Sequence, residues 1–509
     1  MGRKIILSLI ICALCTTALA QVKVNEENFP CENFRNWILM QEWGKSGVIS
    51  DEDIVEITEM DVWEQNISDL TGICFFTNLT FLSLVLNDNQ LTSLDVSNLT
   101  NLQFLSVSRN QLTSLDVSNL TNLQTLFVAN NQLSSLNVSG LANLQVLDFG
   151  HNQLTSIDIS ELTNLRVLRA NNNQLTSLDV SRLTELIYLF VDRNQLTSLN
   201  VSGLTNLERL GVSFNLLTTL NASGLTNLRE LNCRGNQIAS LNISGLMNLR
   251  YLVVATNRLT SLDVSGLTSL DLLDADRNQL TSLDVSELRS LTALFVEDNQ
   301  LTSLDVSGLT DLKLLRVSGN QLTSLDVSEL RNLTELYVGD NQLTSLDASN
   351  LKNLTRLWVI NNQLTSLDVS ELRNLTELLV SDNQLTSLDV SGLTSLNLLD
   401  AEHNQLTSLD VSNLRNLTRF SIRYNELTSL DLSGLNIRTF NGREQSPTLT
   451  LNNYSVEIKL NNPTRFVEGL SYENGRLTST SRNITTSPFS VETGNPDFTL
   501  SGTLILQYE

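Results

Sequence analysis

The chain has 509 residues, of which 41% are hydrophobic and 17% charged, and its formal net charge is −23. A chain this acidic repels phosphate backbones, which excludes a nucleic acid bound through a broad basic face. The apolar fraction is typical of folded proteins rather than disordered ones. Five cysteines are too few for a disulfide scaffold in a chain of this length.

The first twenty residues predict a secretory signal. Arg3 and Lys4 supply a positive start, residues 5–14 an apolar core, and residues 18–20 (Ala-Leu-Ala) a cleavage site. Nothing later approaches the ~20 apolar residues of a membrane span, so we expect no transmembrane segment. The expected location is secreted, or at the cell surface or cell envelope.

Residues 21–78 predict a helical N-terminal cap. Residues 29–43 and 51–57 carry apolar side chains at near-helical spacing. The stretch between the two helices resembles an EF-hand loop, with Gly47 at the turn. Its third and fifth ligand positions hold Gly44 and Ser46, so a plain helix-turn-helix cap is preferred to a calcium site.

Three cysteines remain after the signal segment. Cys31 and Cys74 flank the cap in an oxidising compartment, and we expect this pair to form a disulfide. Cys233 occupies an inward position of the repeat described next, and this position predicts a core thiol rather than a nucleophile.

Residues 79–441 are an internal repeat. The Asn of a recurring N-Q-L motif returns every 21 residues from Asn89 to Asn425, which gives 17 markers. Alternating apolar residues before and after each marker predict short strands with one face inward. One unit cannot bury that face alone, whereas stacked units share a continuous core. We expect the side chains of the marker asparagines to form a hydrogen-bonded ladder through the coils. Proline would remove a backbone donor from any coil, and residues 31–446 contain no proline.

The unit Leu102-x-x-Leu105-x-Val107-x-x-Asn110 resembles the leucine-rich repeat signature. The 21-residue form with N-Q-L-T-S-L-D-V-S resembles the nested-repeat class of bacterial secreted and surface proteins related to the internalins. The resemblance implies a β-rich solenoid of about 17 repeats, between the helical cap and a small all-β C-terminal domain. It also implies a binding protein, since that class includes adhesins and invasins.

In such a solenoid, the side chains 6, 4, 2 and 1 residues before the marker point outward from the concave sheet. These columns vary between coils, while the second half of the repeat barely changes. Aromatic and arginine side chains on a rigid sheet are typical of binding hot spots. The predicted partner-binding residues are Phe104, Phe127, Arg169, Tyr188, Phe190, Arg193, Phe214, Tyr251, Phe295, Arg316, Tyr337, Arg356, Trp358 and Ile360.

Two clusters stand out among these residues, one around Tyr188 and Phe214 and one from Phe295 to Ile360. The partner we expect is a protein on a host or neighbouring cell. A carbohydrate stacked on the rings is one alternative, and a structural cell-envelope spacer without a specific ligand is another. Rings can also gather on a sheet through β propensity and neighbour stacking alone.

Catalysis finds little support in the sequence. His151 and His403 lie 12 coils apart and cannot share a site, and a solvated histidine is preferred to a metal ligand at each. No catalytic motif occurs, so we expect no enzyme, no cofactor and no metal.

A constant column holds an acid or an amide six residues after each marker, with Asp in thirteen coils and Asn in four. Since Asn replaces Asp freely there, we expect hydrogen bonds to the turn backbone rather than a charge-driven role. This column accounts for much of the negative charge.

Beyond residue 441 the period ends. Residues 442–509 alternate like short strands, and Asn474-Gly475 predicts a hairpin turn between two of them. We expect a small C-terminal β cap or sandwich-like domain.

Overall fold

The computed structural model describes residues 21–62, 66–84, 90–432 and 434–442, together with the backbone of the strands between residues 448 and 507. The predicted signal segment, Trp63 and the first marker Asn89 lie outside the described residues. The chain forms two compact units, Met1–Arg258 and Leu259–Glu509. Each unit is described by itself.

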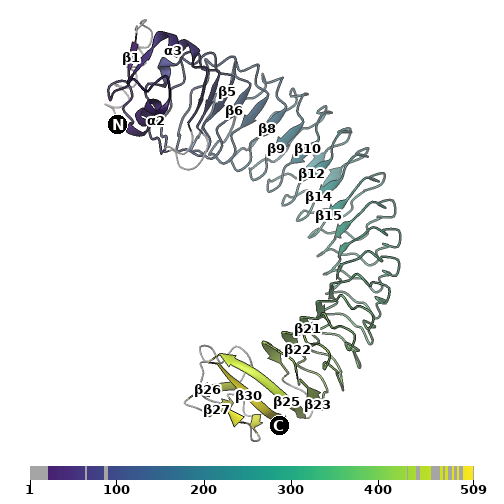
Figure 1. Ribbon diagram of the computed structural model, residues 1–509. Coiled ribbons are helices and arrows are strands. Elements are labelled where there is room, and N and C mark those ends of the chain that lie inside the picture. The colour runs from purple at the N-terminus through teal and green to yellow at the C-terminus, as the bar shows by residue number, and fades with distance from the viewer. Residues whose placement is uncertain are drawn as a thin grey trace. The chain divides into compact units, whose positions relative to one another are not determined.

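The N-terminal unit begins with a small cap (Figure 1). Strand β1 (Gln21–Lys23) pairs antiparallel with β2 (Val48–Ser50), and helices α2 (Glu32–Met40) and α3 (Asp51–Glu56) follow them in the chain. Both predicted helices are present. Helix α2 begins at Glu32 rather than at residue 29, because the Phe29 ring is buried against other rings and the Phe29 carbonyl accepts a 2.7 Å hydrogen bond from Arg35.

The EF-hand-like stretch is a helix cap in the structure. Ser50 and Asp53 form a reciprocal capping box at the start of α3, in which the Asp53 carboxylate accepts from the Ser50 backbone N–H at 3.1 Å. Glu42 pairs with Lys45 at 3.0 Å. The two carboxylates at ligand positions therefore have local partners, as the preferred helix-turn-helix interpretation requires.

The predicted disulfide between Cys31 and Cys74 is not formed in the structure. Cys31 is the N-cap residue of α2 and carries a free, half-buried thiol. Cys74 is buried inside the 3-10 helix η1 (Ile73–Phe75). Sequence separation and compartment gave no information on whether the two side chains meet.

Each coil of the N-terminal unit contributes a three-residue strand to one parallel sheet, and successive strands lie side by side in Figure 1. The strands are β3 (Glu59–Asp61), β4 (Phe81–Ser83), β5 (Phe104–Ser106), β6 (Thr125–Phe127), β7 (Val146–Asp148), β8 (Val167–Arg169), β9 (Tyr188–Phe190), β10 (Arg209–Gly211), β12 (Glu230–Asn232) and β14 (Tyr251–Val253). A second pair, β11 (Thr219–Asn221) and β13 (Ser240–Asn242), comes from the second half of two coils.

The C-terminal unit repeats this arrangement. Its parallel strands are β15 (Leu272–Asp274), β16 (Ala293–Phe295), β17 (Leu314–Arg316), β18 (Glu335–Tyr337), β19 (Arg356–Trp358), β20 (Glu377–Leu379), β21 (Leu398–Asp400), β22 (Arg419–Ser421) and β24 (Thr439–Asn441). From β15 to β22, neighbouring strands pair in register with an offset of 21 residues, as Leu315 and Leu336 do, and the last pair, β22 with β24, has an offset of 20. The sequence period is thus the length of one coil.

The marker asparagines form the predicted ladder. Asn320 donates from Nδ2 to the carbonyl oxygens of Val317 in its own coil, at 3.0 Å, and of Val296 in the preceding coil, at 2.9 Å. Its Oδ1 accepts from the Leu301 N–H at 3.0 Å. The same pattern recurs from coil to coil, so each amide satisfies buried backbone groups of two coils.

A second asparagine ladder runs through the turns, and the sequence analysis missed it. The Asn of the recurring N-L segment donates to a carbonyl of the preceding coil, as Asn143 does to Thr121 at 2.9 Å and Asn332 does to Thr310 at 3.0 Å. Its signal was the regular return of this Asn nine residues before the marker. The two ladders tie both sides of each coil to its neighbour.

The first repeat departs from the uniform spacing. Phe81 of β4 pairs with Phe104 of β5, 23 residues later, although the N-Q-L markers of these coils are 21 residues apart. Phe81 lies eight residues before its marker and Phe104 lies six before the next one, so the strand of the first repeat begins two residues earlier relative to its marker.

Strands are present between residues 448 and 507, as expected. Strand β25 (Thr448–Lys459) pairs in parallel with β23 (Ser429–Asp431) and antiparallel with β30 (Asp497–Gln507), to which β28 (Ile484–Thr486) and β29 (Ser490–Val491) are added. Strands β26 (Leu470–Glu473) and β27 (Arg476–Ser479) pair antiparallel with Glu473 opposite Arg476. The predicted turn residues between them, Asn474 and Gly475, lie outside the described residues.

Candidate functional site

The candidate site is the solvent side of the parallel strands, called here the sheet face. In β9 the central Leu189 is fully buried, while Tyr188 and Phe190 are half-buried on the other side. This alternation recurs in nearly every strand and follows from the two-residue period of extended chain. The predicted outward direction of the columns six and four residues before the marker is confirmed.

The residue just before the marker is displayed by a left-handed turn. Arg193, Phe214 and His403 have φ values of 55°, 53° and 50°, and the corresponding residue of nearly every other coil is also left-handed. Non-glycine residues rarely adopt this conformation, apart from Asn and Asp. The recurrence of Asn, Asp and Gly in this column was the sequence signal for the turn, and the sequence analysis did not use it.

In the first coils, three phenylalanines form a row along the sheet face. Phe104 stacks on Phe81 with ring centroids 4.4 Å apart and meets the edge of Phe127 at 5.7 Å. The sequence analysis named Phe104 and Phe127 but missed Phe81, because the altered spacing of the first repeat moves it out of its column.

The first predicted cluster is divided between two close-packed groups. Phe190 and the Asp192 carboxylate lie against Gly211, where an added Cβ would stand 2.8 Å and 2.7 Å from them. Phe214 lies against Gly235 in the same way, and the Arg193 guanidinium lies 4.5 Å from the Phe214 ring. The rings therefore rest on glycines of the next coil.

Three side chains of this region, Arg209, Phe214 and Tyr251, are exposed to solvent. Arg209 lies 5.7 Å from the Tyr188 ring and pairs with Glu230 at 3.6 Å. Phe214 and Tyr251 each remain 44% exposed, which is unusual for large apolar side chains on a rigid sheet.

The second cluster is a continuous stack across four coils. Arg316 lies between two rings, 5.0 Å from Phe295 and 4.9 Å from Tyr337. The Trp358 ring meets Tyr337 edge-on at 4.6 Å and 83°. Ile360, at the second residue after β19, is half-buried. The structure thus brings together the side chains predicted for this cluster.

Tyr337 differs from the sequence expectation. It faces outward as predicted, but it is only 6% exposed, because Arg316 and Trp358 cover its ring. Its hydroxyl donates to Glu335 at 2.7 Å, and burial, followed by this hydrogen bond, raises the pKa of Tyr337. Tyr337 is a supporting residue of the stack rather than an exposed contact.

Charged partners frame the stack. Arg356 donates to Glu335 at 2.7 Å and lies 3.6 Å from Glu377. Trp358 Nε1 and Arg316 Nε have no hydrogen-bond partner among the described residues. The stack therefore holds two donors whose bonding capacity is unused within the described part of the chain.

Several acids of the sheet face have a raised pKa. Burial is the first cause for Asp148, Asp192 and Asp400. Burial also raises the pKa of Asp276 to about 7, with the neighbouring Asp274 carboxylate as the next cause.

The histidines and Cys233 pack against groups of neighbouring coils or lie in the core. His151 Nε2 lies 3.2 Å from the Asn172 amide, and the His403 ring packs on Tyr424 at 4.1 Å. Among the described residues, no group of three His, Cys, Asp or Glu side chains is placed to hold a metal ion. Cys233 is fully buried, and burial raises its thiol pKa to about 12.

The constant acid column has the predicted hydrogen-bonding role. Asp305 accepts from the backbone N–H of Ser307 at 3.0 Å and from its hydroxyl at 2.7 Å, and these bonds lower the pKa of Asp305. Asn137 accepts the same two bonds from Ser139, at 3.1 Å and 2.8 Å. Since an amide oxygen replaces the carboxylate without loss of a bond, this column is a turn device.

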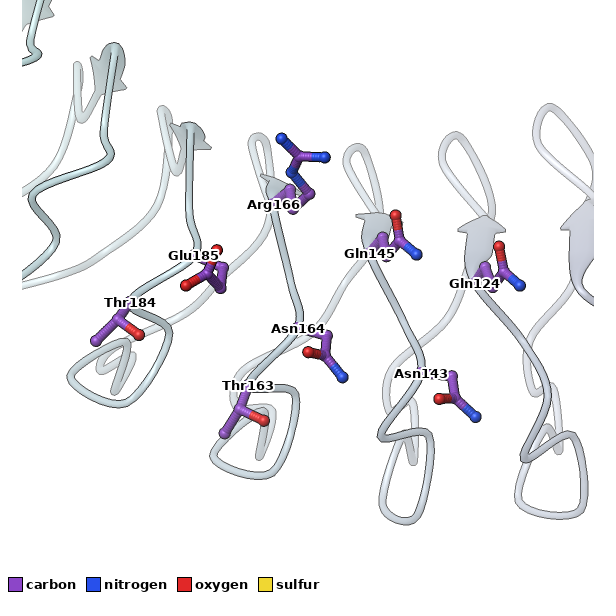
Figure 2. A pocket seen from close by; sticks show the side chains of 8 residues that line it. All are labelled: Gln124, Asn143, Gln145, Thr163, Asn164, Arg166, Thr184 and Glu185. Carbon is purple, nitrogen blue, oxygen red and sulfur yellow. The ribbon is translucent and has the colours of Figure 1, made fainter.

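Figure 2 shows an open polar pocket of about 730 Å³ in the N-terminal unit. Gln124, Gln145 and Arg166 directly precede the strands β6, β7 and β8, and the other lining residues come from the turns before β7, β8 and β9. The turn residues are Asn143, Thr163, Asn164, Thr184 and Glu185. No sequence reasoning identified this pocket.

Comparison with known proteins supports the repeat assignment. The model of a family described as leucine-rich repeats in two copies matches residues 100–143, 142–183, 226–269 and 331–373. No curated protein sequence is similar enough to count as a match. In the described residues, no helix has the length and apolar character needed to cross a membrane.

Three solved structures are similar to this chain. The functional domain of InlJ from Listeria monocytogenes is 26% identical, with a TM-score of 0.65, and the match covers 97% of this chain and 100% of that one. The internalin InlF from Listeria monocytogenes is 27% identical over 71% of this chain and 98% of its own, with a TM-score of 0.50.

The third is the leucine-rich repeat ectodomain of the receptor kinase GASSHO1 from Arabidopsis thaliana, in complex with CASPARIAN STRIP INTEGRITY FACTOR 2. It is 25% identical over 75% of this chain and 58% of its own, with a TM-score of 0.58. Together with the coil-by-coil register of the strands, these likenesses show that the chain is a leucine-rich repeat solenoid similar to the internalin-like bacterial proteins.

Proposed function

We propose that this chain is a secreted adhesion or interaction protein that binds a protein partner on a host or neighbouring cell through the sheet face. The observation that carries the proposal is the stack from Phe295 to Trp358, in which Arg316 is held between two rings. Aromatic and arginine side chains fixed by their neighbours lose little entropy on binding and are typical of interface hot spots.

The coverage of the rings favours a protein over a sugar. Carbohydrate platforms need open ring faces, whereas Arg316 covers Phe295 and Tyr337, and Arg209 lies over Tyr188. The GASSHO1 ectodomain complex is a further precedent for a ligand of this class of solenoid. A cell-envelope spacer would have no need of a preformed stack.

The test compares two variants whose new residues already occur at the same position of other repeats. Trp358→Leu places the residue of the next coil, Leu379, at the centre of the stack. Met247→Thr removes a 64% exposed apolar side chain from a turn and serves as the matched control. Both variants should keep the circular dichroism spectrum and melting curve of the wild type.

We expect a surface protein to be captured by the wild type and by Met247→Thr, and at least about tenfold less by Trp358→Leu. A glycan array run beside the capture separates the alternatives. Binding of a glycan that depends on Trp358, without a protein partner, would replace the proposal with the carbohydrate function. Equal behaviour of all three proteins in every assay would support a spacer.

A further inference from the structure

One stretch of the N-terminal unit has a net charge opposite in sign to that of the chain. Residues 166–258 contain nine arginines and five acids, a net charge of +4, within a chain whose net charge is −23. Seven of these arginines lie in strands β8 to β14 or within three residues of them, and they define the arginine patch. They are Arg166, Arg169, Arg193, Arg209, Arg229, Arg234 and Arg250.

The patch is accessible. Six of its arginines are exposed, and Arg169 is half-buried. Acids of the same coils are engaged locally, since Glu230 pairs with Arg209 and Asp192 accepts from the Ser213 N–H at 2.8 Å. Burial also raises the pKa of Asp192. Within residues 166–258 the arginines outnumber the acids, and these two acids are already engaged by groups of the same coils.

Exposed rings lie among these arginines. Arg193 lies 4.5 Å from the Phe214 ring and Arg250 lies 6.0 Å from the Tyr251 ring, and both rings remain 44% exposed. Packing on the Phe214 ring holds the Arg193 guanidinium in place, and a guanidinium packed in this way can still donate its N–H groups to an acceptor. The combination of ordered arginine and exposed aromatic surface suits carboxylates next to apolar side chains.

The polar pocket of Figure 2 adjoins the patch, since Arg166 belongs to both. Its Gln124 and Gln145 amides each offer a donor and an acceptor, as the main chain of an extended peptide requires. Five strands span the patch, which at about 4.8 Å per step corresponds to roughly 19 Å, or about six extended residues.

From these observations we infer that the arginine patch binds an acidic polypeptide segment of about six residues that carries aromatic or apolar side chains between its carboxylates. The inference rests on the proposed function only in that the partner is a protein. It names the chemistry of that partner, and it uses coils different from those of the Phe295–Trp358 stack.

The probe is a fluorescent random copolymer of glutamate and tyrosine, bound to the full mature chain and followed by fluorescence anisotropy. The patch variant combines Arg193→Asn and Arg234→Asn, because Asn130 and Asn171 occupy these columns in other coils. The control is Arg182→Asn, which removes an exposed arginine from a turn. Phe214→Asn tests the ring, since asparagine tolerates the left-handed backbone.

At 50 mM salt we expect about tenfold weaker binding for the patch variant, about fivefold weaker for Phe214→Asn, and no change for Arg182→Asn. Raising the salt to 300 mM should weaken the wild type more than the patch variant. Trp358→Leu should bind the copolymer like the wild type, so failure of the stack and failure of the patch are distinguishable.

Three results would overturn the inference. One is equal binding by the wild type and the patch variant. Another is heparin bound as tightly as the copolymer or more tightly, which would assign the patch to a sulfated polysaccharide. The last is salt-sensitive self-association without any probe, which would make the acidic surface of a second copy the occupant.

Discussion

Loss of a single marker asparagine should open the solenoid at one coil. In Asn320→Ala, the Leu301 N–H loses its acceptor at 3.0 Å while remaining among fully buried neighbours. The carbonyls of Val317 and Val296 lose one donor each, but Asn341 and Asn299 still donate to them at 3.0 Å and 3.2 Å. The orphaned N–H therefore dominates the cost, which we place at about 2 kcal/mol.

Hydrogen exchange followed by mass spectrometry reads this cost at the site. An opening free energy lower by about 2 kcal/mol corresponds to about 30-fold less protection of the Leu301 amide. A local readout is preferable to a melting temperature, since stability in a repeat array is a sum over neighbouring coils. The expected change is confined to peptides of the coils on either side of Asn320.

The matched control is Asn332→Ala in the turn ladder. Its amide makes one exposed hydrogen bond to Thr310 at 3.0 Å, so the loss should stay below about 1 kcal/mol and leave the Leu301 amide unchanged. The reasoning is refuted if Asn320→Ala exchanges like the wild type at Leu301, or if the turn variant opens the same amide equally.

Three further predictions concern titration and thiol reactivity. Hydrogen bonds from serine lower the pKa of Asp263, Asp284 and Asp305. The stabilisation by these three ionised groups is therefore present above their unfolded-state pKa and is lost as the pH falls through their folded-state pKa. The variant with all three replaced by Asn should melt like the wild type at pH 7 and lose less stability than the wild type between pH 5 and 3. Burial raises the pKa of Asp276 to about 7, so the stability of the wild type should fall as the pH rises from about 4 to 7. At pH 8, denaturant titrations should find Asp276→Asn more stable than the wild type by about 1–2 kcal/mol, a value that includes solvent screening. Without reductant, iodoacetamide at pH 8 should label Cys31 and leave Cys233 unmodified in the folded chain; labelling of Cys233 at a comparable rate would contradict its buried position.

The repeat made the fold predictable because one unit of sequence is one unit of structure. Leu315 and Val317 are buried like their equivalents in the other described coils. The 21-residue period alone therefore predicted where each strand lies, which of its side chains face inward, and the ladder to which Asn320 belongs. Features that depend on one particular coil were missed. The shifted register at Phe81 and the free Cys31 both lie at the N-terminal end of the array, where no repetition of the sequence predicts local structure.

Which side chains face outward was predictable from the period, but how far each is exposed was not. Tyr337 is buried because its two neighbours along the sheet are Arg316 and Trp358, whereas Phe214 stays open because the next coil offers Gly235. Exposure in a parallel sheet depends on pairs in adjacent coils, at 21-residue separation. A comparison of each variable position with its neighbours one repeat away would have identified both cases.

The distribution of charge follows the same logic and bears on partner choice. In most coils the constant half of the repeat contributes one acid, which accepts the hydrogen bonds of a turn. The negative net charge of the chain therefore grows with the number of repeats and carries no information on a ligand. The variable half of the repeat needs no acid for a turn, and its arginines make the net charge of residues 166–258 positive. Screening over about 10 Å at 0.1 M salt lets a patch roughly 19 Å long act on a partner largely independently of acids on the turns. In a repeat protein, the charge that selects a partner is therefore the charge of the variable columns.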